Sequence, residues 1–375
     1  MYSLEKGLAL HYAGLYERSN ERFALADEYI TELYTRRISD LGFSFLTNDN
    51  ELPYPGEPYE DIYLNVFKAL NFAALRDPQA VFVEVRILDE KLSFMERRYK
   101  DLAESYRSGA AGELGEELDM ETAREEQDFN PGQTQFHSSA LGRYLGFITR
   151  LQLGDDDGAR IDLEKMQEAF LNQPEIYNFD FPNLPALADP PAHKARVHFL
   201  AALGKGPEKY EVRDRIQYGD LYITIAFPRL QKRGTSISRV EILKNGETVT
   251  QLEKLEDVNQ VAENVFQLHQ PLIHAKALVR GLGKALIGRE ARAQTGNLFL
   301  ELLILGVQEA TEQADLRTTR LLPGQFHAGY HHVPAGEEVN FTVNYYSDGS
   351  IIKSETITRT FAKNELNLVR LQSFK

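Results

Sequence analysis

Three histidines near the end of the chain carry a side chain that commonly binds metal ions or transfers protons in proteins. They are His327, His331 and His332. On a β-strand, His327 and His331 would share one face, but they would reach a common metal ion only if the strand bent. No third ligand accompanies them on that face. We therefore interpret them as side chains of a sheet, and we expect neither a metal site nor a cofactor.

Residues for nucleophilic catalysis or phosphate binding form no complete motif. The chain has no cysteine, which excludes thiol nucleophiles and thiolate metal ligands. It has no glycine-flanked serine elbow and no helical His-Glu-x-x-His motif. Residues 281–284, Gly-Leu-Gly-Lys, resemble part of a phosphate-binding loop, but Leu278 stands where that loop needs glycine, and Ala285 follows the lysine. We expect no catalytic residue; a hydrolase with an unrecognised site is an alternative.

Three consecutive aspartates, Asp155, Asp156 and Asp157, have the chemistry of a cation site. Consecutive carboxylates point in different directions, however, and this stretch occupies the turn between two predicted helices. We therefore expect no cation here.

A basic stripe is the most distinctive surface feature of the second half. Lys276, Arg280 and Lys284 are spaced four apart, on a different face of a predicted helix from its leucines. Such a helix could lie on an anionic membrane surface, which makes the chain a peripheral membrane protein in one alternative. In the other alternative the helix belongs to a hairpin that covers one face of a sheet. We favour the second, because a sheet must have its apolar face covered.

Charge is divided unevenly along the 375 residues. The chain has 56 acidic and 42 basic residues and a net charge of −14. Residues 1–200 hold 36 of the acidic and 20 of the basic residues, whereas residues 201–375 are nearly neutral. A surface of this sign does not neutralise phosphates, so we expect no nucleic-acid partner. The chain also has no apolar run of eighteen residues, and no spanning helix is predicted.

The first half has the residue spacing of paired helices. Between residues 7 and 26, small and aromatic residues such as Gly7, Gly14 and Phe23 recur with charges between them. This spacing matches the tetratricopeptide pattern, in which small residues let two helices approach closely. Two further candidate copies follow, at 67–87 and 144–166. Together they predict an α-solenoid.

This helical domain is predicted to span residues 1–205 and to end in a helix at about 192–203. In the tetratricopeptide register, Asn65, Phe72 and Tyr144 fall on the inner helices and are candidate residues of a partner-binding groove. The alternative is that these three side chains only pack.

The second half changes from a helical to a strand period. Leu221, Ile223 and Ile225 alternate with other residues, and Asn245-Gly246 and Asp348-Gly349 are hairpin turn pairs. We predict a linker at 206–219, followed by an antiparallel β-sandwich-like domain at 220–375. An amphipathic helical hairpin is inserted at about 258–314. The fold class is therefore α+β multidomain.

Several short motifs resemble an uncharacterised family of bacterial tetratricopeptide-like proteins. They are Leu4-Glu5-Lys6-Gly7, Leu15-Tyr16-Glu17-Arg18-Ser19-Asn20, Tyr54-Pro55-Gly56-Glu57, Lys68-Ala69-Leu70-Asn71, Ala226-Phe227-Pro228, Glu256-Asp257-Val258-Asn259 and the segment from Thr311 to Arg317. The resemblance implies helical repeats followed by a β-rich domain, often in a predicted envelope lipoprotein. The chain departs from the family at Thr319, where the family tends to have tryptophan.

These patterns together favour a non-catalytic scaffold or adaptor that binds a protein partner. The resemblance implies the cell envelope or periplasm. The alternative is the cytoplasm, because the chain as given shows no signal peptide and no lipid-bearing cysteine. The sequence predicts no oligomeric state.

Overall fold

The computed structural model describes residues 2–39, 52–113, 134–187, 190–218, 221–268, 313–363 and 365–375, together with several positions between 270 and 281. Most of the helices lie in the first part of the chain and the strands lie in the second, which confirms the mixed helix-and-sheet composition. The helices are α1 (Tyr2–Tyr12), α2 (Tyr16–Ser39), α3 (Pro58–Ala74), α4 (Pro78–Glu113), α6 (Ala140–Leu153) and α7 (Asp156–Asn172). The strands are β1 (Lys194–Leu203), β2 (Glu208–Tyr218), β3 (Leu221–Gln231), β4 (Arg239–Lys244), β5 (Glu247–Asp257), β6 (Gln325–Pro334), β7 (Glu338–Ser347), β8 (Ser350–Thr360) and β9 (Asn367–Ser373).

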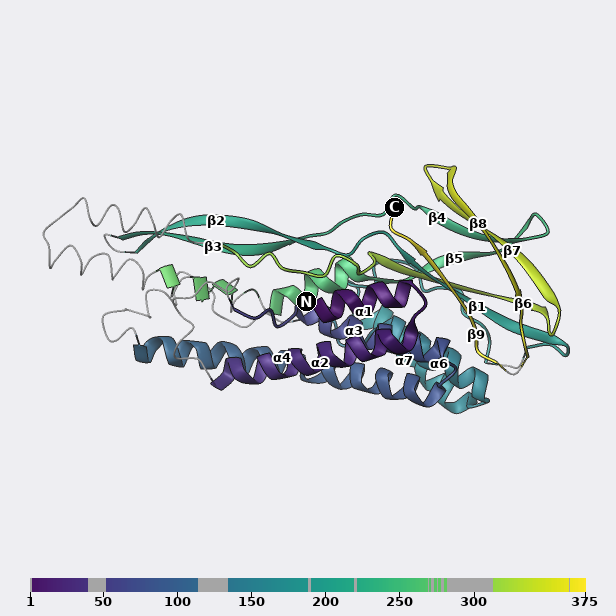
Figure 1. Ribbon diagram of the computed structural model, residues 1–375, viewed down its shortest axis with the longest axis horizontal. Helices are drawn as coiled ribbons and strands as arrows, with labels where there is room; N and C mark the ends of the chain where they lie inside the picture. Colours follow the sequence, from purple (N-terminus) through teal and green to yellow (C-terminus); the bar gives the residue numbers. More distant parts are fainter. Residues whose placement is uncertain are drawn as a thin grey trace, which may run out of the picture.

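The helices form three consecutive pairs, α1–α2, α3–α4 and α6–α7, that lie against one side of the sheet (Figure 1). The three predicted helical pairs are therefore present, although a regular solenoid is not shown. Local capping explains where two of the helices start. Pro58 begins α3 behind a capping box of Glu57 and Glu60. Asp155 caps α7 by accepting a hydrogen bond from the Gly158 amide, so the aspartate run begins a helix.

Close packing of the first pair depends on Gly7. A Cβ atom at this position would lie 2.5 Å from Cε1 of Phe23, a fully buried side chain of α2. We expect Gly7→Ala to lower the free energy of unfolding by about 1–2 kcal/mol, even though alanine favours helix formation. Urea unfolding measures this loss. The control is Gly234→Ala, because no heavy atom lies within 4 Å of a Cβ there; equal effects at both sites would contradict the packing explanation.

Seven strands form one curled sheet in the order β8-β7-β4-β5-β6-β1-β9. All neighbours are antiparallel except β1 and β9, which are parallel. The curl brings distant strands together, since Phe199 of β1 and Phe341 of β7 pack with ring centroids 5.1 Å apart. One curled sheet therefore encloses an apolar core. In the predicted sandwich, two separate sheets would have packed face to face around that core.

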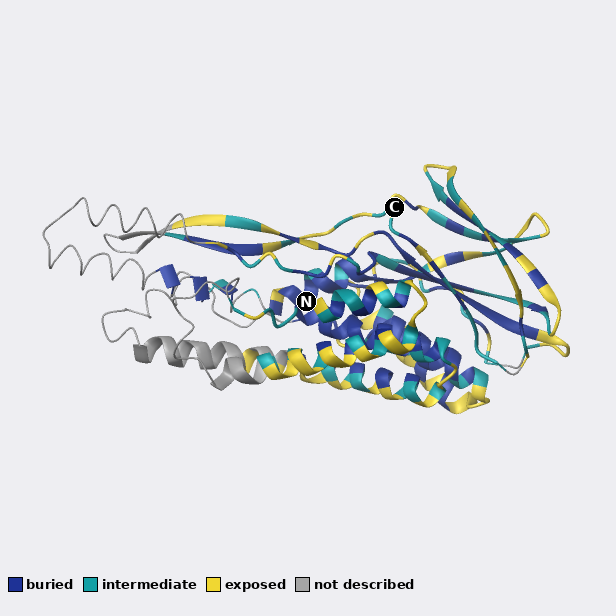
Figure 2. Ribbon diagram, viewed as in Figure 1, coloured by how far each residue is buried: buried dark blue, intermediate teal, exposed yellow. Residues whose placement is uncertain are grey.

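The predicted helix at 192–203 is wrong, because this segment is strand β1. Leu200 and Ala202 pack against the helices, whereas Val197, Phe199 and Ala201 belong to the core inside the sheet. Both faces of β1 are thus buried. Figure 2 shows buried residues in dark blue where the helices lie against the sheet. The sequence of a strand that is buried on both faces is a continuous apolar run without polar alternation. A buried helix segment has the same pattern, so the two cannot be distinguished by periodicity.

Residues 206–219, predicted as a linker, contain strand β2 instead. It pairs with β3 along eleven residues in a separate two-stranded ribbon, which extends away from the seven-stranded sheet (Figure 1). The domain boundaries themselves stay predictions.

The predicted insertion begins as expected with a helix. It starts at Val258, directly after β5, and its described residues are helical as far as Gly281. We call it the post-β5 helix. Residues 282–312, which hold the rest of the predicted hairpin, lie outside the described residues. Within the part of the chain that is described, no helix is long and apolar enough to cross a membrane.

Candidate functional site

Two of the three predicted groove residues are internal. Asn65 is buried and donates a hydrogen bond to Oε2 of Glu84 at 2.7 Å. Tyr144 is buried, and its hydroxyl lies 3.3 Å from Nδ1 of His198 on β1. Phe72 is half-buried against the helical core. Asn65 and Tyr144 thus hold elements of the fold together, and partner binding through these residues stays a prediction.

Two of the three cations of the basic stripe belong to the described residues, and neither is on an exposed face. Lys276 and Arg280 are only 6% and 3% exposed, so the structure does not present them to a lipid surface as the membrane alternative requires. Lys284 lies outside the described residues. The two described cations instead line a pocket.

The histidines of β6 do not gather around a metal position. Across the described ranges, no group of three potential ligands could hold a metal ion. His327 is buried, and its Nε2 lies 3.1 Å from Oε1 of Gln325. Burial lowers the pKa of His327 to about 4, which keeps its ring neutral at neutral pH.

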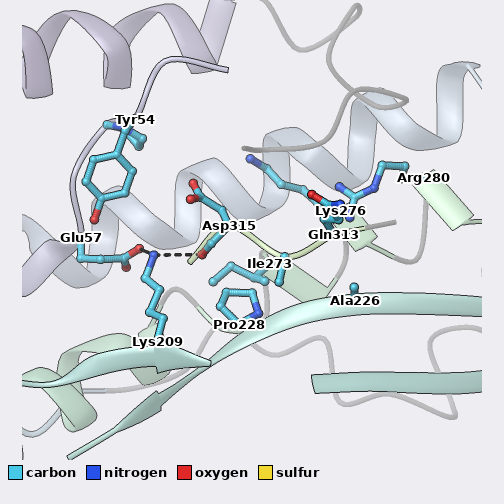
Figure 3. A pocket seen from close by; sticks show the side chains of 12 residues that line it. Tyr54, Glu57, Lys209, Ala226, Pro228, Ile273, Lys276, Arg280, Gln313 and Asp315 are labelled. Atoms are coloured by element: carbon cyan, nitrogen blue, oxygen red, sulfur yellow. Dashed lines mark hydrogen bonds and ion pairs between the residues drawn. The ribbon is translucent and has the colours of Figure 1, made fainter. Parts of the chain in front are cut away.

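A pocket forms where four segments meet, and we call it the cationic pocket (Figure 3). The loop before α3, the β2–β3 ribbon, the post-β5 helix and the segment that precedes Leu316 contribute its walls. Glu57 and Lys209 lie at one end of the view and Arg280 at the other. The lining residues are Tyr54, Pro55, Glu57, Lys209, Ala226, Pro228, Ile273, Lys276, Arg280, Gln313, Ala314 and Asp315.

Lys209 is the most deeply buried cation of this pocket, with a side chain 2% exposed. It forms a close ion pair with Glu57 and donates a hydrogen bond to the backbone carbonyl of Asp315 at 3.4 Å. Its Nζ also lies 5.4 Å from the ring centroid of Tyr54, a cation–π distance. Lys209 was not among the predicted site residues, because it lies in β2, within the segment predicted as a linker.

The second carboxylate of the pocket, Asp315, is held by Arg317. Nε and Nη2 of Arg317 donate hydrogen bonds of 2.8 Å to the two oxygens of Asp315. The same guanidinium lies 5.2 Å from the Tyr54 ring. Both carboxylates that line the pocket therefore already accept hydrogen bonds or ion pairs from cations, which fixes their position.

Glu60 lies behind the pocket as a fully buried carboxyl group. It accepts hydrogen bonds from the Tyr54 hydroxyl at 2.7 Å and from the Thr319 amide at 2.5 Å. Burial, and then the neighbouring charge of Glu57, raise the pKa of Glu60. Glu60 thus joins the loop that carries Tyr54 to Thr319. Thr319 occupies the position where the resembled family tends to have tryptophan.

A second surface feature is a groove on the outer side of the helical layer, which we call the Phe94 groove. It runs between the start of α3 and the middle of α4. Buried Ile62 and Met95 lie beneath it, whereas Phe94 is 55% exposed. Its lining residues are Pro58, Asp61, Ile62, Ile87, Glu90, Lys91, Phe94, Met95 and Arg98. Aromatic side chains, Phe included, are enriched at protein–protein interfaces relative to the rest of the surface.

Charged side chains surround this groove and are ordered by one another. Lys91 donates a hydrogen bond to Asp27 of α2 at 2.9 Å and forms a close ion pair with Asp61 of α3. Arg98 lies 3.7 Å from the same Asp61 carboxylate. The groove therefore has an apolar floor and a rim of both charge signs.

Comparisons with family models, curated proteins and solved structures find no match for this chain. The likeness to tetratricopeptide-like proteins therefore remains a resemblance.

Proposed function

We propose that this chain is a non-catalytic scaffold or adaptor that binds a protein partner through its helical half. The observation that carries the proposal is the Phe94 groove, where an aromatic side chain is more than half exposed beside a buried apolar floor. Aromatic residues in such positions are enriched among residues that dominate binding energy. The predicted solenoid, which rests on the residue spacing of the paired helices, and the envelope location, which rests on the resemblance, belong to this proposal.

The rim specifies the chemistry of the partner. Asp61 and Glu90 are acidic, whereas Lys91 and Arg98 are basic. The partner segment that fits is amphipathic, with an apolar side chain against Phe94 and charges of both signs beside it. The role of a scaffold is also supported by the buried hydrogen bonds of Glu256. They join the end of β5 to α3 and to the start of α6, and so hold the helices in a fixed position on the sheet.

The test uses a photo-crosslinking amino acid in place of Phe94 in the full chain, with the same replacement at Leu171 as the control. Leu171 is 78% exposed and lies near the end of α7, outside the groove residues. We expect one defined protein adduct from position 94 and none from position 171. With that partner purified, Phe94→Ala is expected to weaken binding about tenfold, as loss of a hot-spot aromatic does. Equal adducts at both positions, or unchanged affinity, would contradict the proposal.

A further inference from the structure

We propose that Lys209 and Glu57 become joined by an isopeptide bond, a covalent amide between the lysine amine and the glutamate side-chain carboxyl. The bond connects β2 of the ribbon to the loop before α3, and it forms without an external enzyme. The proposal does not depend on the protein partner, because neither residue lines the Phe94 groove.

The two reacting groups are already in contact and are shielded from water. Lys209 and Glu57 form a close ion pair, and their side chains are 2% and 3% exposed. In a direct ion pair the nitrogen lies roughly 3–3.5 Å from the carboxyl carbon, which is the separation of reacting atoms in a near-attack conformer. The pair Lys68–Glu84 of the helical layer is less well shielded, with side chains 12% and 6% exposed.

Burial favours the neutral forms of both groups, which are the reactive ones. An ammonium has no free electron pair, so a proton first passes from Lys209 to Glu57 within the pair. This transfer removes two charges from a dry site and with them their desolvation cost. Glu60 adds to the preference, because it is a second buried carboxyl whose pKa is raised by burial and then by the charge of Glu57. The same repulsion disfavours the ionised form of Glu57.

The atoms of the step balance without an oxidant or a co-reactant. The neutral amine of Lys209 attacks Cδ of the protonated Glu57 carboxyl, a C–N bond forms, and one C–O bond breaks. The hydroxyl group leaves with a proton from the attacking nitrogen, as one water molecule. Both residues line the cationic pocket, whose volume of about 30 Å³ is large enough to take up this water.

Neighbouring groups hold the two reactants in place. The backbone amide of Glu57 donates a hydrogen bond of 2.8 Å to Oε2 of Glu60, within the capping box that begins α3. Nζ of Lys209 donates a hydrogen bond to the backbone carbonyl of Asp315 at 3.4 Å. Fixed positions of this kind raise the effective concentration of one reactant beside the other, which accelerates a reaction between them.

The bond gives the scaffold a covalent link between its helical layer and its ribbon. A chain without cysteine has no disulfide to connect distant segments. A link between residues 57 and 209 closes a long loop of the unfolded chain and lowers its conformational entropy, which stabilises the folded state.

Mass spectrometry of the intact, denatured full chain tests the proposal. We expect the parent chain to be lighter than its sequence by the mass of one water molecule, and Lys209→Arg to have the full mass of its sequence. Arginine keeps the positive charge beside Glu57, but its guanidinium stays protonated and is not a nucleophile. Lys68→Arg is the matched control, because it changes the more exposed pair, and it is expected to lose one water molecule as the parent does.

A protease digest of the same samples locates the bond. We expect one branched peptide that contains both Glu57 and Lys209 in the parent chain, and none that joins Lys68 to Glu84. A parent chain with the full mass of its sequence would overturn the proposal, whether or not the variants fold. Loss of water without that branched peptide, or an equal loss in Lys209→Arg, would overturn it too. Phe94→Ala is expected to leave the mass loss unchanged, which separates this test from that of the protein partner.

Discussion

Replacing Glu256 with alanine is expected to lower the free energy of unfolding by about 3–5 kcal/mol, because it removes one acceptor that several buried hydrogen-bond donors share. Glu256 is fully buried at the end of β5. Its Oε1 accepts a hydrogen bond from Tyr63 of α3 at 2.8 Å. Its Oε2 accepts hydrogen bonds from the Ser139 hydroxyl at 2.8 Å, the Tyr177 hydroxyl at 3.0 Å and the Leu141 amide at 3.1 Å. Alanine would leave all four donors without this acceptor.

Urea unfolding at neutral pH measures the loss. Glu247→Ala provides the control, because Glu247 is an exposed acid on the same strand and its removal is expected to change the free energy by no more than about 0.5 kcal/mol. Glu256→Gln is expected to cost less than alanine, since one amide oxygen still accepts hydrogen bonds and burial already raises the pKa of Glu256. A loss below about 1 kcal/mol for Glu256→Ala would show that this network does not hold the helices to the sheet.

The second large effect is loss of stability in acid. Burial lowers the pKa of His11 and His327 to about 4 and that of His198 to about 3. In the unfolded chain a histidine binds its proton near pH 6.5, whereas the folded rings stay neutral. As pH falls below about 6.5, the unfolded state therefore binds more protons and the folded state loses relative stability. By pH 4 this amounts to about 3 kcal/mol for each histidine.

Two buried acids act in the opposite direction. The raised pKa values of Glu60 and Glu256 mean that the folded state takes up protons before the unfolded state does as pH falls toward 4.5. Their protonation therefore offsets part of the histidine effect, and the contribution of one histidine must be measured by comparing variants.

The variant that isolates this effect is His198→Gln, which removes the most strongly shifted histidine. We expect the free energy of unfolding of His198→Gln to fall less steeply than that of the parent chain between pH 6.5 and 4, by about one proton. His137→Gln is the control, because His137 is exposed, and its slope is expected to match the parent. Urea unfolding at half-unit pH steps provides both slopes; parallel curves for the parent and His198→Gln would refute the assignment.

Features that depend on adjacent residues could be predicted. The hairpin turns at Asn245-Gly246 and Asp348-Gly349 have positive φ at all four positions, between 47° and 82°, because these residue types tolerate that region of backbone space. The aspartates at 155–157 cap and begin α7 for a similarly local reason.

Features that depend on what covers an element could not be predicted. Strand β1 lacks alternation because helices bury one face and the curled sheet buries the other. Asn65 lies on α3 as expected, but its partner Glu84 on α4 turns it into an internal contact. Periodicity indicates which residues share a face, but it does not indicate what lies against that face.

The motifs that resemble the tetratricopeptide-like family also make contacts that the sequence does not indicate. Asn71 donates hydrogen bonds to Ser19 and Asn20 of another motif, each at 2.8 Å. Glu5 accepts a hydrogen bond from the Arg320 amide at 2.6 Å, across a sequence separation of 315 residues. These short motifs are therefore parts of polar networks that exist only after the helices and strands have packed.

The amino-acid sequence alone was enough to indicate helices before strands, the turn residues, the helix starts and the absence of thiol chemistry, because each depends on composition or on neighbouring residues. The cationic pocket arose only from packing. Its ion pair joins Glu57 to Lys209, and its far wall comes from the helix that carries Lys276 and Arg280. Lys276 and Arg280, two cations of a stripe for which a membrane surface was one alternative, line this pocket together with residues of the β2–β3 ribbon and of the loop before α3. No local pattern records such a long-range contact.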